Sequence, residues 1–291
     1  MVLESIVVPE RWLHHPMRML VIGLVYSLLG IMLGILLFGR YASVAGIFLT
    51  TIPLVVIWYH AIYDEERKSM EKSTEHMHLA QYKHILWFFI FLFVGMVFAY
   101  SLWFTFMPLA LVTVSTAIQI DTIYSIQNQF AATGASTLDT NDLVVILLNN
   151  LRVLLFCIIF SFVYGAGAIF ILSWNASVIG VAIGNMGREG LARLGQLGQS
   201  PSIMTYFSVL PVSISYLIHG LPEVVSYFFG ILAGGIISEA VVCHHYREPE
   251  FWRVIKDSSS LILVSLMILL LAALIEVYVT PVLFDPLKAI T

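Results

Sequence analysis

Residues 19–38 read MLVIGLVYSLLGIMLGILLF, a run of 20 residues without a single charged side chain. A helix of about 20 apolar residues is long enough to span the hydrocarbon core of a bilayer. The rest of the chain has the same character, since 59% of its 291 residues are hydrophobic and 11% are charged, whereas soluble proteins carry about 25% charged residues. This composition excludes a soluble enzyme, a nucleic-acid-binding protein and a disordered scaffold.

The other apolar stretches are continuous rather than alternating, which favours spanning helices over a β-barrel. We therefore predict an all-α polytopic membrane protein in the cytoplasmic membrane, in contact with the lipid bilayer. A long apolar run over 85–114 is expected to end or bend near Pro108. The predicted spans, counting that run as one, are 19–38, 41–60, 85–114, 151–174, 204–218, 221–242 and 261–280.

The region 143–185 could hold two crossings in a tight hairpin, or one crossing followed by a re-entrant segment or half-length helix, and the basic residues decide between them. With one crossing over Leu151–Trp174 and a re-entrant segment over Asn175–Asn185, eleven of the 14 lysines and arginines lie on one side of the membrane. That side should be the cytoplasm. The prediction is about seven helices with broken or re-entrant segments, the N-terminus inside and the C-terminus outside.

The same pattern predicts three regions along the chain. Residues 1–60 form a two-helix transmembrane hairpin, residues 61–84 a polar cytoplasmic linker, and residues 85–285 a transmembrane core. Within 115–148, apolar residues recur at steps of three and four, which predicts a helix lying in the membrane interface or docked on the bundle. Three glycine pairs spaced four apart, the spacing at which helices approach closely, are interpreted as packing sites: Gly30/Gly34, Gly180/Gly184 and Gly230/Gly234.

Polar side chains inside the predicted spans are candidates for a structural or functional role, because inserting a charged side chain near the bilayer centre costs about 2.5–3.5 kcal/mol. His219 and Glu223 are four residues apart at a helix start, so they could act as a proton relay, as two metal ligands, or as a helix cap. We expect Arg152 to meet Glu223 or Glu276 in the bundle. The candidate residues are Asn149, Asn150, Arg152, Asn175, His219, Glu223 and Glu276.

Several of these residues stand in strings that resemble the stage II sporulation protein M family. The strings are Asn-Asn-Leu-Arg-Val at 149–153, Gly-x-Gly at 165–167, Asn175, His219-Gly220 with Glu223, and Ala-Ala-Leu-Ile-Glu at 272–276 leading to Thr-Pro at 280–281. The resemblance covers about residues 84–285 and adds Gly220 to the candidate residues. It implies a membrane scaffold that recruits partners to a complex rather than an enzyme.

We consider three alternative functions for the protein. The first is a non-enzymatic scaffold or assembly factor with protein partners or further copies of itself, and with no cofactor or nucleic acid. It is favoured by the lack of any nucleophile–base arrangement or nucleotide-binding loop in the sequence. The second is a transporter or channel that uses intramembrane histidine, glutamate and arginine. The third is a metal-dependent intramembrane hydrolase with His219 and Glu223 as ligands and a third from Glu276.

Overall fold

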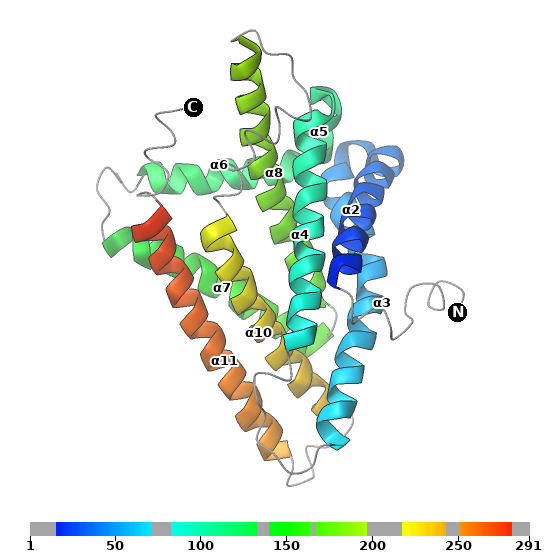
Figure 1. Ribbon diagram of the computed structural model, residues 1–291, viewed down its shortest axis with the longest axis vertical. Helices are drawn as coiled ribbons and strands as arrows, with labels where there is room; N and C mark the ends of the chain where they lie inside the picture. The colour runs from blue at the N-terminus through cyan, green and yellow to red at the C-terminus, as the bar shows by residue number, and fades with distance from the viewer. Residues whose placement is uncertain are drawn as a thin grey trace.

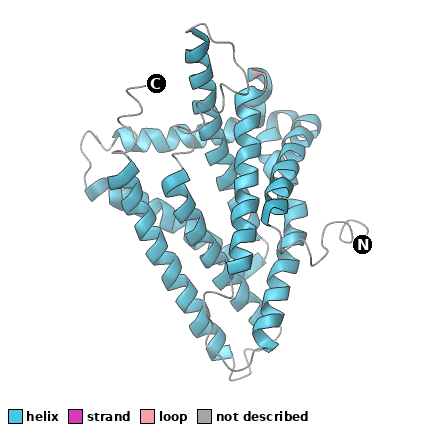
Figure 2. Cartoon of the chain, viewed as in Figure 1, coloured by secondary structure: helices cyan, strands magenta, loops and turns pink. Residues whose placement is uncertain are grey.

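The computed structural model describes residues 16–71, 83–132, 140–164, 167–196, 217–242 and 251–280, and these ranges are almost entirely helical, with no strand among them (Figure 2). The predicted all-helical fold is therefore confirmed. The elements in chain order are α2 (Pro16–Phe38), η2 (Gly39–Tyr41), α3 (Ala42–Glu71), α4 (Lys83–Phe106), α5 (Leu109–Ser115), α6 (Ala117–Ala132), α7 (Thr140–Tyr164), α8 (Gly167–Gln196), α10 (Leu217–Val242), α11 (Phe251–Leu274) and η5 (Ile275–Val279).

Six segments of the described chain are long and apolar enough to cross a membrane, which confirms the polytopic membrane class. The first, Met17–Ile57, has 41 residues and includes the turn η2, where Gly39 has a φ of +51°. α2 and α3 therefore fold back on each other. The other segments are Leu86–Phe106, Leu143–Val163, Ala168–Arg193, Gly220–Val242 and Val254–Val279. The number of crossings and their orientation stay predictions.

Two predicted boundaries can be compared directly with the structure. α4 ends at Phe106, two residues before Pro108, and the short helix α5 follows, so the expected break near that proline is present. α3 continues past residue 60 to Glu71, so part of the predicted linker is helical. The predicted span over 204–218 lies almost wholly outside the described residues.

The region 143–185 differs from the prediction. The predicted crossing from Leu151 to Trp174 falls on two long helices, α7 and α8, which lie on either side of residues 165–166. Both are long and apolar enough to span a membrane. The stretch 175–185, predicted to be re-entrant, is the middle of the uninterrupted helix α8. The re-entrant alternative for 175–185 is therefore wrong, and the chain continues as a helix after Trp174.

The extent of α8 differs from the prediction because Arg188 was treated as a basic residue in a cytoplasmic loop over 186–202. Arg188 lies within α8, and its guanidinium donates hydrogen bonds to the carbonyl oxygens of Phe104, at 3.0 Å, and Met107. These carbonyls lie at the end of α4, where carbonyl oxygens lack helical partners and the helix dipole is negative. An arginine held by a neighbouring helix end is fixed by the fold, so its charge does not report the orientation of a loop.

Arg188→Met should lower the free energy of unfolding by about 2 kcal/mol, because hydrogen bonds to a charged donor are lost at the end of α4. Arg193→Met is the matched control, since Arg193 is exposed on the same helix, and it should change stability by less than about 0.5 kcal/mol. Denaturant titration in detergent micelles measures both. Equal losses in the two variants would contradict the role assigned to Arg188.

α6 lies across one end of the bundle (Figure 1), as a helix docked on the other helices. Its fully buried Gln119 accepts a hydrogen bond from the Ser43 hydroxyl of α3, at 2.6 Å, and its amide nitrogen donates to Ser177 of α8, at 3.2 Å. A buried amide is costly unless its hydrogen bonds are made. Gln119 therefore fixes the position of α6 against two helices that run in the bundle.

Close helix contacts occur at all three predicted glycine pairs, so their interpretation as packing sites is confirmed. A Cβ atom at Gly184 would lie 2.6 Å from the Phe104 Cβ atom, and one at Gly234 would lie 2.6 Å from the Ile158 carbonyl oxygen. A fourth contact was not predicted. Gly23 of α2 and Gly95 of α4 each face the backbone of the other helix, so the first helix packs directly on the part of the chain that carries the family resemblance.

Candidate functional site

Asn150 of α7 is the centre of a polar cluster between α7, α10 and α11. Its amide nitrogen donates a hydrogen bond of 2.5 Å to the Glu223 carboxyl of α10, and its amide oxygen accepts one of 3.1 Å from the Tyr227 hydroxyl. Asn150 and Tyr227 are 7% and 3% exposed. Both polar ends of one buried amide are therefore used by two side chains that lie one turn apart on α10.

Glu276 completes the cluster from the end of α11. Its carboxyl group lies close enough to the carboxyl group of Glu223 for the two to interact electrostatically. Glu276 lies in η5, a five-residue π-helical segment, and the Thr280 hydroxyl donates to the Ile275 carbonyl five residues earlier. A π-helical turn shifts the side chains that follow it around the helix axis, and such turns are frequent at functional sites.

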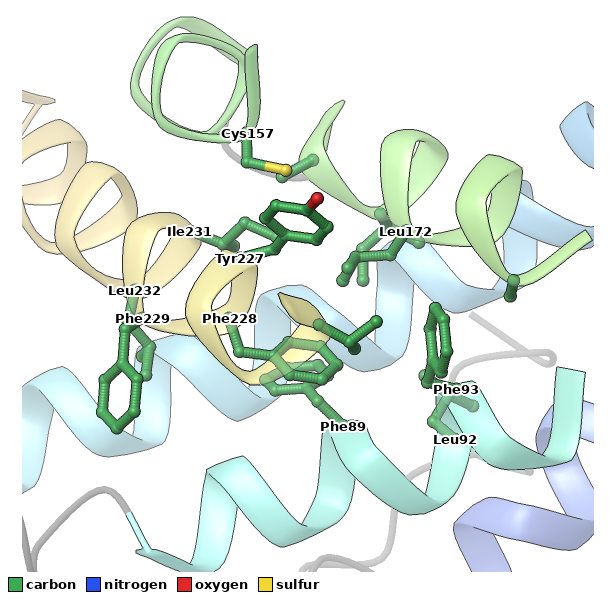
Figure 3. Close-up of a cluster of buried hydrophobic side chains, with 14 of the residues drawn as sticks. Phe89, Leu92, Phe93, Cys157, Leu172, Tyr227, Phe228, Phe229, Ile231 and Leu232 are labelled. Atoms are coloured by element: carbon green, nitrogen blue, oxygen red, sulfur yellow. The ribbon is translucent and has the colours of Figure 1, made fainter. Parts of the chain in front are cut away.

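The surroundings of the cluster are apolar. Tyr227 stands in the main hydrophobic core with Cys157, Leu172 and Ile231, and its hydroxyl points toward α7 (Figure 3). On the same helix, Phe228 stacks on Phe89 of α4 with ring centroids 5.3 Å apart. In such low-dielectric surroundings a polar group without a partner is expensive. The hydrogen bonds of Asn150 are therefore a structural requirement as well as a possible functional feature of the site.

The proximity of the two glutamates also affects their charge. Two ionised carboxylates at close range in a low-dielectric site repel each other, so such pairs commonly share a proton. Within the described residues no lysine or arginine is bonded to the pair. Glu223 and Glu276 are therefore candidates for sharing a proton, while Asn150 donates to Glu223.

The remaining predicted residues are not brought into this cluster. Asn149 and Arg152 are exposed on the opposite side of α7, so the expected contact of Arg152 with Glu223 or Glu276 is wrong. Asn175 lies in the middle of α8 and donates to the Ile171 carbonyl of its own helix at 2.8 Å. Gly220 is buried at the start of α10. His219 belongs to α10, but its side chain lies outside the described residues.

The position of each side chain around the axis of α7 explains why the expected contact of Arg152 with the glutamates is not formed. Asn150 and Arg152 are two residues apart, which on a helix places them on different faces. Because α7 is apolar around most of its circumference, its sequence gives no periodic signal for the inward face. The side chain of Asn150 is inward and that of Arg152 is outward.

One member of the cluster, Tyr227, was missed by the sequence reasoning. The signal was present, because Tyr227 follows Glu223 by four residues and such pairs share a helix face. No group of three histidine, cysteine, aspartate or glutamate side chains that could hold a metal ion is found within the described part of the chain.

Comparison with known proteins agrees with the resemblance seen in the sequence. The sequence model of the family described as stage II sporulation protein M matches residues 84–281, which include every residue of the cluster. An uncharacterised protein of Methanocaldococcus jannaschii is 29% identical over 139 residues, covering 47% of this chain and 69% of the relative. No solved structure matches the chain.

Proposed function

The chain belongs to the stage II sporulation protein M family, and from this premise we propose that it is a scaffold that assembles a protein complex in the cytoplasmic membrane. The observation that carries the proposal is the outer face of α7, which we define as Leu148, Asn149, Arg152, Leu155, Phe156 and Ile159. The four apolar members are between 43% and 54% exposed, and the two polar members are exposed among them.

Lipid tails alone are unfavourable neighbours for the two polar side chains on the outer face of α7. Intramembrane arginines almost always face a bundle interior, a water-filled cavity or a partner, and asparagine side chains form hydrogen bonds between membrane helices. The inward cluster supports the same proposal in another way. Asn150 has both of its polar ends bonded within the chain, as expected of a residue that holds helices together.

Photo-crosslinking in native membranes tests the proposed scaffold function. A photoreactive residue at Leu155 should give discrete protein adducts, because a partner covers the outer face of α7. The matched control is Leu270 of α11, which is 45% exposed compared with 54% for Leu155, and it should give adducts with lipid alone. Identical adduct patterns at the two positions, or substrate turnover by the purified protein without a partner, would contradict the scaffold.

A proton-coupled transporter is the second candidate, and the proximity of the Glu223 and Glu276 carboxyl groups inside the bundle favours it. Glu223→Gln keeps the shape of the side chain and can still bond to Asn150, but it cannot release a proton. If the protein transports, proton flux into liposomes should be abolished in this variant. Absence of flux in the wild-type protein across a broad panel of solutes would remove this candidate.

A further inference from the structure

We propose that the outer face of α7 binds a transmembrane helix of another protein that carries an aspartate or glutamate at the depth of Arg152. This inference rests on the scaffold function proposed above and names the chemistry of the partner. The face is a stripe on one side of the helix, since Leu148, Arg152, Leu155 and Ile159 follow one another at steps of four, three and four residues. Arg152 lies in the middle of that stripe.

The depth of Arg152 argues for a partner within the membrane. The apolar segment of α7 runs from Leu143 to Val163, and Arg152 lies nine residues after its start and eleven before its end. At about 1.5 Å per residue, the Cα atom is roughly 13 Å along the helix axis from the nearer end. Arginines close to a helix end reach the headgroups by snorkelling, whereas Arg152 stands near the middle of its segment.

The chemistry of the face argues for a carboxylate. Among the described residues, neither Asn149 nor Arg152 has a hydrogen-bond or ion-pair partner, and both residues are exposed. A planar guanidinium matches a carboxylate with two parallel hydrogen bonds. Asn149 is three residues away on the same side of the helix and can bond to the backbone or side chain of the same partner helix.

Two other possible binding partners, a second copy of this chain and a lipid phosphate, match the outer face of α7 less well. A second copy of this chain pairing through the same face would bring one Arg152 toward the other, and like charges oppose such an interface. A lipid phosphate lies in the headgroup layer, above the middle of a spanning segment. An acidic side chain on a partner helix can lie at the required depth, because its own charge is compensated there by Arg152.

The probe is a synthetic single-span peptide of leucine and alanine with one glutamate at its centre, mixed with the full chain in phosphatidylcholine vesicles. Association is followed by energy transfer between a dye on the peptide and one on the protein. The glutamate peptide should bind about tenfold or more tightly than a peptide with leucine at that position, and a glutamine peptide should fall between them. Arg152→Leu should remove the preference, and Arg152→Lys should keep part of it.

Three results would overturn the proposal. They are equal binding of the glutamate and leucine peptides, association that requires phosphatidylglycerol in the vesicles, and self-association of the protein through α7 that excludes the peptide. Failure of the peptide experiment while Leu155 still crosslinks to protein would leave the scaffold in place and reject the acidic partner. Failure of both experiments would reject the scaffold as well.

Discussion

Asn150→Leu is expected to lower the free energy of unfolding by about 3 kcal/mol, the larger of two effects predicted for the adjacent asparagines. The substitution removes the hydrogen bonds that Glu223 and Tyr227 make with Asn150 inside the bundle. Each unsatisfied buried polar group costs about 1–3 kcal/mol, and a charged one costs more. The loss is measured by reversible unfolding in mixed micelles, or by steric trapping in bilayers.

Asn149→Leu is the matched control, because it makes the same chemical change one residue earlier. Asn149 is exposed on α7, so its replacement should change the free energy of unfolding by less than about 0.5 kcal/mol. Losses of similar size in the two variants would contradict the hydrogen-bonded cluster. A loss confined to Asn149→Leu would mean that α7 is rotated with its other side toward α10.

Gly95→Ala should also lower stability by about 3 kcal/mol, at the contact between α2 and α4. A Cβ atom at this position would lie 2.1 Å from the Leu20 carbonyl oxygen, which belongs to the backbone and cannot turn away. The helices must move apart, and overpacking of this kind costs about 1–3 kcal/mol or more. The same unfolding measurement detects the loss, and a cysteine crosslink between α2 and α4 should form more slowly.

Gly220→Ala is the control for Gly95→Ala. Among the described residues, the nearest atom to a Cβ at Gly220 is the Ile179 Cδ1 atom, at 3.9 Å, which is an ordinary contact at the end of a flexible side chain. Alanine has the higher helix propensity by about 1 kcal/mol, so stability should stay constant or rise. A loss at Gly220 as large as that at Gly95 would show that close backbone contact is not what makes Gly95 necessary.

The helical membrane class could be predicted from composition and from the length of apolar runs, because both follow from the thickness of a bilayer. The glycine contacts could be predicted for the same kind of reason, since a missing side chain at a spacing of four leaves a groove in a helix. Asn150 and Glu223 were both named in advance, and the structure joins them through one hydrogen bond.

Other features depend on contacts that the sequence does not encode locally. The length of α8 was missed because Arg188 was counted as a loop charge, although it lies within that helix and binds the end of α4, more than 80 residues earlier in the chain. The direction of Arg152 was missed because an apolar helix gives no sign of which side faces its neighbours. Gln119 was passed over because polar residues on an interfacial helix are ordinarily exposed, whereas this one is fully buried.

The most direct test of the account is to measure stability and crosslinking together in two variants of α7. Arg152→Leu should keep or raise the free energy of unfolding, since it removes an exposed charge from an apolar segment, and it should abolish the protein adducts formed from Leu155. Asn150→Leu should lower stability and keep those adducts in the molecules that remain folded. A loss of stability in Arg152→Leu with its adducts retained would contradict the division of α7 into an inner face that holds the bundle and an outer face that binds a partner.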